Sequence, residues 1–294
     1  FNTKTQSAIF NCNKTGDIDH THWSVSVKDA RMELLDNGLG VHNGLLSASG
    51  KWIYDTWSSH DTFRHIDLVG TAKNGGKVVV TNFKKYDSPW KSYNVPIIKG
   101  GTILAADGKT PLYYRLVLPV GFDASKKYPT VVYVYGGPHA NNVENRWNYA
   151  SRPWEIYMAQ RGYIVFVVDN RGSQYRGFEF ESCTHRHLGD VEMQDQMEGV
   201  KFLKSLPYVD ANRLGVHGWS FGGFMTTNLM CSYPDVFKVG VAGGPVIDWK
   251  FYEVMYGERY MDTPQENPEG YESSNLLNKA KNLKGRLQII VGYN

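Results

Sequence analysis

Six residues in the second half of the chain, Gly218-Trp219-Ser220-Phe221-Gly222-Gly223, restrict the possible folds most strongly. They follow an alternating stretch typical of a β-strand (213–217) and precede an apolar stretch typical of a helix (224–230). A serine between glycines at a sharp strand-to-helix turn is the context of a nucleophile elbow, since residues without a Cβ let the backbone pass close. We therefore predict that the Ser220 hydroxyl stands at the carboxyl end of a sheet, above a helix N-terminus that favours negative charge.

Strands and helices are expected to alternate on both sides of this turn. Apolar runs with few polar interruptions are typical of strands buried on both faces of a parallel sheet. Residue 190 is an aspartate, which can cap a helix whose apolar side chains fall on one face. The predicted strands are 112–119, 130–135, 163–169, 239–242 and 287–291, and the predicted helices are 154–160, the one after Asp190, and 249–260. This alternation predicts a doubly wound, mainly parallel sheet of the α/β-hydrolase class.

The first ninety residues have a different sequence pattern. They lack helical periodicity and contain short strand-like runs at 23–27, 52–54, 63–69 and 77–83, a spacing typical of a β-sandwich or of propeller blades. Ninety residues form at most two blades, so the segment is expected to be the end of a larger β domain. We predict two domains: residues 1–95, the C-terminal part of a β-propeller, and residues 96–294, an α/β-hydrolase domain.

Composition excludes several classes of function. The net charge is +3 without a cluster of Lys and Arg, which gives no basic surface for nucleic acid. No apolar run approaches the roughly 20 residues that span a bilayer. The three cysteines, at 12, 183 and 231, predict neither a disulfide framework nor a zinc site. The chain begins with Phe1 and shows no signal peptide, so it is expected to be an internal piece of a longer polypeptide.

A histidine pair near the N-terminus could suggest a metal site. His20 and His22 lie close to Asp17 and Asp19 in the sequence. Their spacing fits no established ligand pattern, and we expect a solvated turn there instead.

Acyl transfer needs a base for the serine and donors for the oxyanion. All nine histidines precede Ser220, and His217, on the elbow strand, is expected to point into the fold. One oxyanion donor would be the backbone N–H of Phe221, the residue after the nucleophile. The stretch that begins at Tyr135 (Tyr135-Gly136-Gly137-Pro138) could supply the second through the tyrosine hydroxyl, although a turn that merely closes a buried strand explains the same residues.

Three aromatic residues follow the elbow at helical spacing. Trp249, Tyr252 and Tyr256 recur at intervals of three and four, which places them on one face of the predicted helix. They could form the wall of a pocket or pack against the core.

Several sequence motifs together resemble the dipeptidyl peptidase IV family of the prolyl oligopeptidase clan, and within it most of all the bacterial prolyl tripeptidyl aminopeptidases. They are Asp169-Asn170-Arg171-Gly172, Pro245-Val246-Ile247-Asp248-Trp249, residues 255–271, the elbow and the stretch at Tyr135. The resemblance is strong over residues 101–294. Residues 1–90 match only as a plausible end of the family's propeller.

The resemblance implies a serine exopeptidase that releases tripeptides, or dipeptides, ending in proline from free N-termini. Ser220 would be the nucleophile, with the Tyr135 hydroxyl and the Phe221 N–H as the oxyanion hole. The proline pocket would map onto Phe221, Val246, Trp249, Tyr252 and Tyr256, and Glu253 could join the carboxylates that bind the substrate's ammonium group. A solvated Glu253 on a helix surface is the open alternative.

The resemblance also implies that no metal or organic cofactor is needed, that the protein is extracytoplasmic and that it can form a homodimer. The triad Asp and His of the family would lie beyond Asn294, so the chain is expected to be a fragment or a processed form. Two rival functions fit the same residues: an esterase or acylaminoacyl peptidase on the same fold, and a non-catalytic binding protein.

Overall fold

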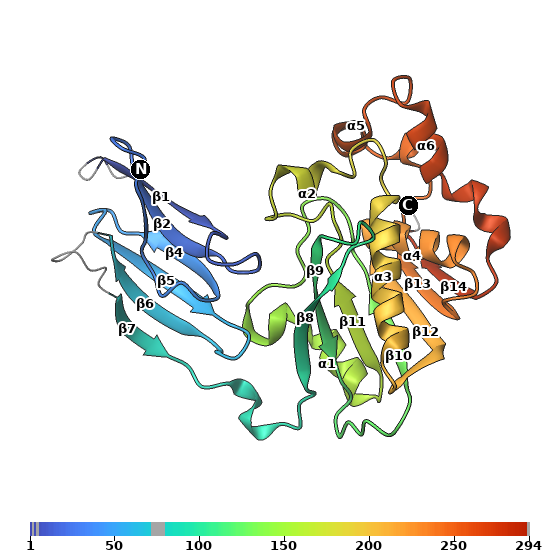
Figure 1. Ribbon diagram of the computed structural model, residues 1–294, viewed down its shortest axis with the longest axis horizontal. Helices are drawn as coiled ribbons and strands as arrows, with labels where there is room; N and C mark the ends of the chain where they lie inside the picture. The colour runs from blue at the N-terminus through green and yellow to red at the C-terminus, as the bar shows by residue number, and fades with distance from the viewer. Residues whose placement is uncertain (2, 4–5, 72–79, 293–294) are drawn as a thin grey trace. The chain divides into compact units, whose positions relative to one another are not determined.

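The chain divides into two compact units. The computed structural model describes residues 1, 3, 6–71 and 80–292 (Figure 1). The first unit comprises Phe1–Asn94 together with Val143–Ser151, and the second comprises Val95–Asn142 and Arg152–Asn294.

The first unit is built from two antiparallel sheets. One has the strand order β1-β2-β3 and the other β4-β5-β6-β7. The strands are β1 (Ser7–Cys12), β2 (Thr21–Ser26), β3 (Met32–Leu34), β4 (Val41–Leu46), β5 (Trp52–Ser58), β6 (His65–Gly70) and β7 (Val80–Lys85), followed by the 3₁₀ helix η1 (Pro89–Ser92). Residues 77–79 of the last predicted strand lie outside the described residues. These sheets are the end of a β-propeller domain, as predicted.

The expectation of a solvated turn at His20 and His22 is wrong. Both side chains are buried, with 8% and 5% of their surface exposed, and His22 lies on β2. The backbone N–H of His42 donates to the carbonyl of His20 at 2.9 Å, which joins the two sheets. Asp19 accepts hydrogen bonds from the Gly40 N–H and the Asn145 amide instead of contributing to a shared ligand set with the histidines.

The second unit is an α/β-hydrolase fold around a seven-stranded sheet, which confirms the predicted class. The strand order is β14-β13-β12-β10-β11-β9-β8. The four pairings among β10 to β14 are parallel, whereas β9 pairs antiparallel with both β8 and β11. The strands are β8 (Ile98–Leu104), β9 (Pro111–Val117), β10 (Tyr128–Tyr133), β11 (Ile164–Val168), β12 (Val209–Trp219), β13 (Val239–Gly243) and β14 (Arg286–Ile290).

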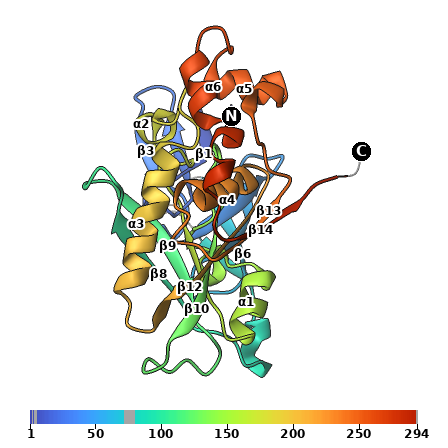
Figure 2. The same cartoon turned by 90° about the vertical axis from the view of Figure 1, so that its right-hand side faces the viewer.

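Helices cover both faces of this sheet. Helix α1 and helix α3 lie on opposite faces, and the elbow helix α4 packs on β12 and β13 (Figure 2). Every residue of α4 except the last is buried, because this helix lies between the sheet and the helices around it. The helices are η2 (Trp147–Ala150) in the first unit, and α1 (Pro153–Gln160), α2 (Phe178–Ser182), α3 (Val191–Ser205), α4 (Phe221–Ser232), η3 (Trp249–Phe251), α5 (Val254–Met261), α6 (Pro268–Ser274), η4 (Leu276–Asn278) and η5 (Ala280–Asn282) in the second.

Two sequence expectations are wrong in detail. The predicted helix 249–260 is broken into η3 and α5, because Glu253 adopts an extended conformation and caps α5. Asp190 stands at the N-cap position of α3 without a side-chain capping bond, and the Glu192 carboxyl group accepts the Gly189 N–H at 3.0 Å instead. In the described part of the chain no helix is both long and apolar enough to cross a membrane.

Candidate active site

Ser220 lies on the sharp turn between β12 and α4. Its backbone has φ 58° and ψ −118°, a left-handed region that a residue with a side chain rarely adopts. The Ser220 N–H donates to the carbonyl of Gly243 on the adjacent strand at 2.8 Å, which holds the turn in place. The predicted strand, turn and helix are therefore present, with the serine in the strained conformation of a nucleophile elbow.

The glycines of the elbow are required by close backbone contacts. A Cβ on Gly218 would lie 2.3 Å from the carbonyl oxygens of Gly222 and Val134, and one on Gly222 would lie 2.2 Å from the Val134 oxygen. A Cβ on Gly223 would lie 2.4 Å from the oxygen of Gly243. No other residue type fits these positions without moving the strand beside the elbow.

The two predicted oxyanion donors lie just beyond the ends of two neighbouring strands of the sheet. Tyr135 follows β10, and Phe221 is the first residue of α4, directly after β12. Their rings lie 6.1 Å apart between centroids. Because the first N–H groups of a helix have no partner within it, the Phe221 N–H is available to a negatively charged oxygen near Ser220.

The Tyr135 hydroxyl keeps its proton at neutral pH. Burial raises the pKa of Tyr135, and the neighbouring phenols of Tyr252 and Tyr133 add to the increase, with Tyr256 acting in the opposite direction. A tyrosine that stays protonated can donate a hydrogen bond to a developing oxyanion, which is the role the sequence assigned to it.

The aromatic residues of the predicted pocket form one cluster despite the broken helix. The Trp249 ring lies 5.5 Å from Tyr252 and 5.7 Å from Tyr256, and the planes of Trp249 and Tyr256 differ by only 10°. The Phe221 ring lies 5.5 Å from Trp249, which joins the cluster to the elbow. Trp249 comes from η3, Tyr252 ends that turn, and Tyr256 comes from α5.

The members of this cluster differ in exposure. Phe221 and Trp249 are 1% and 2% exposed and therefore form its floor, whereas Tyr252 is 38% exposed at its rim. Val246 is 8% exposed and, with Tyr252, lines a hollow of about 430 Å³. The other residues that line this hollow are Gly244, Pro245, Ile247, Asp248, Phe251 and Leu277.

Glu253 performs a local structural task. Its exposed carboxylate accepts the Met255 N–H at 3.0 Å and so caps the N-terminus of α5. The predicted contact with a substrate ammonium group remains a proposal.

His217 is engaged away from the elbow, as predicted. Its Nδ1 lies 2.9 Å from the carbonyl oxygen of Val241, and its ring packs 5.1 Å from Trp154 and 5.8 Å from Tyr133.

The structure adds Tyr260 and His139, which sequence reasoning missed, to the neighbourhood of the cluster. The Tyr260 ring lies 4.8 Å from Tyr256 and 5.8 Å from His139. Tyr260 is four residues after Tyr256, so extending the same helical spacing by one step would have found it. His139 directly follows the predicted oxyanion stretch.

Comparison with known proteins agrees with this geometry. Residues 149–294, which contain the elbow and the aromatic cluster, match the profile of the prolyl oligopeptidase family (Peptidase_S9). A crystal structure of a dipeptidyl aminopeptidase IV candidate from Bacteroides ovatus superposes with a TM-score of 0.89 at 51% identity and covers 98% of this chain. The chain belongs to the prolyl oligopeptidase family.

Similarity to two dipeptidyl peptidases places the chain in the dipeptidyl peptidase IV branch of the family. Dipeptidyl peptidase 4 of Porphyromonas gingivalis superposes with a TM-score of 0.87 at 32% identity over 97% of this chain. Human dipeptidyl peptidase 8 is 38% identical over 186 residues, 62% of this chain. The chain spans 21% of the length of the human protein and 40% of each of the two solved structures.

Proposed function

We propose that the full-length protein is a serine exopeptidase that releases tripeptides, or dipeptides, ending in proline from free peptide N-termini. The observation that carries this proposal is the strained Ser220 beside Phe221, whose ring connects the elbow to a cluster of aromatic faces. Membership of the prolyl oligopeptidase family supports the same chemistry.

In this proposal Ser220 attacks the carbonyl carbon of the proline residue and forms an acyl-enzyme. The Phe221 N–H and the Tyr135 hydroxyl donate to the oxygen that becomes negatively charged, and the leaving amine takes a proton. Water then hydrolyses the ester and restores the serine. Because His217 Nδ1 is held by the carbonyl of Val241, this proposal does not assign His217 the role of the base.

The aromatic cluster accounts for the choice of proline. Tyr252 and Tyr256 present ring surfaces over a buried floor of Trp249 and Phe221. A proline ring is rigid and loses little conformational entropy when it is buried, and aromatic faces cover its apolar atoms. Selection of a free N-terminus requires carboxylates near the ammonium group, and Glu253 is the local candidate.

The test compares 4-nitroanilide substrates with the full-length protein. We expect release from Ala-Ala-Pro and from Ala-Pro substrates, with the tripeptide preferred, and loss of release when the N-terminus is acetylated or proline is replaced by alanine. Ser220→Ala must abolish the activity.

Other outcomes identify the rival functions. Hydrolysis of acyl esters or of acetylated substrates in preference to free prolyl peptides would indicate an esterase or acylaminoacyl peptidase. Absence of hydrolysis of every substrate would leave a binding protein on the hydrolase scaffold.

We further propose an extracytoplasmic location and a homodimer for the full-length protein, both on the resemblance to the family. Fractionation of cells and light scattering of the purified protein test the two proposals directly.

A further inference from the structure

Three buried groups from different strands converge inside the first unit. His22 lies on β2, His42 on β4 and Asp55 on β5, so the group joins the two antiparallel sheets. Their side chains are 6%, 1% and 0% exposed. One nitrogen or oxygen from each residue lies within 4.8 Å of those from the other two.

The hydrogen bonds orient all three side chains toward one point. Asp55 lies between the histidines, with one oxygen 3.1 Å from His22 Nε2 and the other 2.6 Å from His42 Nδ1. The second ring nitrogen of His42, Nε2, donates to the carbonyl of Leu39 at 3.0 Å. Because a carbonyl oxygen only accepts, Nε2 carries a proton, so in a neutral ring both Nδ1 and the Asp55 oxygen present lone pairs, and a proton or a metal ion must lie between them.

A second acidic side chain lies beside this cluster. Asp36 is 1% exposed, lies 3.5 Å from His42 Nδ1 and accepts the His22 N–H at 2.5 Å. Two acidic side chains, Asp36 and Asp55, therefore lie beside the His42 ring in a buried site. Buried charge of this kind is costly unless it is compensated. A divalent cation with both histidines neutral would balance the two carboxylates.

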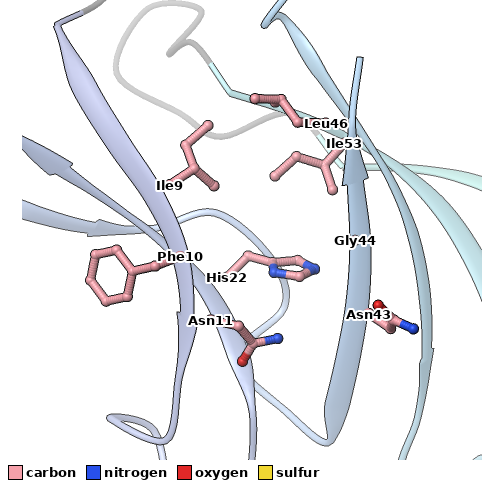
Figure 3. Close-up of a pocket in the computed structure, with 8 residues that line it drawn as sticks. All are labelled: Ile9, Phe10, Asn11, His22, Asn43, Gly44, Leu46 and Ile53. Atoms are coloured by element: carbon pink, nitrogen blue, oxygen red, sulfur yellow. The ribbon is translucent and has the colours of Figure 1, made fainter. Parts of the chain in front are cut away.

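One member of the cluster faces a cavity. His22 lines a cavity of about 210 Å³, and Figure 3 shows its ring projecting between the strands toward β4. Gly44 on β4 makes room for this ring, since a Cβ there would lie 2.6 Å from His22 Nε2. The cavity is also lined by Ile9, Phe10, Asn11, Asn43, Leu46 and Ile53.

We propose that His22, His42 and Asp55 bind one divalent transition-metal ion of the Zn²⁺ type between the two sheets. The ligand atoms are Nε2 of His22, Nδ1 of His42 and a carboxylate oxygen of Asp55. A water from the cavity takes the fourth position, and Asp36 balances the remaining charge.

The chemistry of the donors favours this class of ion. Imidazole nitrogens with a carboxylate oxygen suit zinc and its neighbours, whereas calcium and magnesium take oxygen ligands. The bond from His42 Nε2 to Leu39 is the outer contact that fixes the tautomer of a zinc-binding histidine. In a tetrahedral site with zinc bonds of about 2.0 Å, two ligand atoms lie roughly 3.3 Å apart. The distances between the donor atoms of the three side chains range from 2.6 Å to at most 4.8 Å and therefore bracket this value.

The experiment measures zinc in the full-length, tag-free protein after treatment with a chelator and dialysis. We expect uptake of one Zn²⁺ per chain with a dissociation constant below about 1 µM, a rise in melting temperature on adding Zn²⁺, and visible absorption typical of tetrahedral Co²⁺ when cobalt replaces zinc. His22→Gln should weaken zinc binding by roughly 100-fold or more, while His65→Gln, a matched change on β6 outside the ligand set, should leave it unchanged.

A variant that keeps all three ligands guards against misfolding of His22→Gln. Gly44→Ala displaces the His22 ring and should also weaken binding. Failure of the wild-type protein to take up stoichiometric zinc would overturn the proposal and leave a network held by protons alone. Zinc uptake that is equal in the wild type, a folded His22→Gln and Gly44→Ala would overturn it as well.

Discussion

Gly137 lies so close to Phe221 that a Cβ on residue 137 would be 2.5 Å from the Cγ of the phenylalanine ring. This contact joins the loop after β10, which carries Tyr135, to the first residue of the elbow helix. The relative position of the two proposed oxyanion donors therefore depends on the absence of a side chain at residue 137.

Replacing Gly137 tests this relationship. Gly137→Ala should lower kcat by at least 10-fold with a smaller change in KM, because it moves the Phe221 N–H or the Tyr135 hydroxyl away from the reacting oxygen. Steady-state kinetics on prolyl 4-nitroanilides provide the measurement. Gly257→Ala is the control, since its Cβ would meet the nearest atom only at 3.7 Å. Equal kinetics for the two variants would contradict the proposed coupling.

Tyr135→Phe removes one oxyanion donor and leaves the ring. Turnover should fall by roughly 100-fold with a modest change in substrate binding, as expected for a bond made mainly in the transition state. The kcat and KM of the purified full-length variant test this. An unchanged turnover number would exclude Tyr135 from the role.

Two members of the aromatic cluster should respond differently to truncation because their burial differs. Trp249→Ala removes a large ring that is 2% exposed and should cost about 3–5 kcal/mol of stability, visible as a lower melting temperature. Tyr252→Ala removes a ring that is 38% exposed and should raise KM for prolyl substrates with little change in melting temperature. The expectation for Tyr252 is wrong if its melting temperature falls as far as that of Trp249→Ala.

Glu192 should make stability depend on pH. Its carboxyl group is fully buried, which raises its pKa to about 8. Since the unfolded value is near 4.3, the folded state holds a proton that the unfolded state has lost between these two values. The contribution to stability is therefore complete below about pH 4 and is lost as pH rises through about 8, at up to about 1.4 kcal/mol per pH unit.

The comparison with Glu192→Gln isolates this effect, because glutamine does not titrate. Melting temperatures measured from pH 5 to pH 8 should show the wild type losing stability relative to the variant as pH increases. A difference that stays constant over this range would contradict a neutral, buried Glu192.

The sequence revealed the elbow because close backbone contacts require its glycines, and such a requirement is visible in a short motif. The sequence also predicts that Trp249, Tyr252 and Tyr256 lie side by side, and their rings do so although the helix expected to carry them is interrupted. The spacing of three and four residues matched a continuous helix, and the interruption comes from the capping bond of Glu253, which a periodic pattern does not reveal.

Other features depend on pairings between distant residues. Strand β8 was missed because Gly100 and Gly101 are typical of a loop, yet Gly101 is needed opposite Tyr114, whose hydroxyl would lie 2.6 Å from a Cβ. The local sequence predicts a solvated turn for His22 because its partners, His42 and Asp55, come from strands 20 and 33 residues away. The division into domains at residue 95 stays a prediction.

The most direct measurement of the account is the labelling of the full-length protein with a fluorophosphonate, followed by mass spectrometry of its peptides. The account predicts one modified residue, Ser220, and protection from labelling by a tripeptide that ends in proline. An unmodified Ser220, or modification that such a peptide does not slow, would contradict the claim that this serine is the nucleophile of a prolyl peptidase.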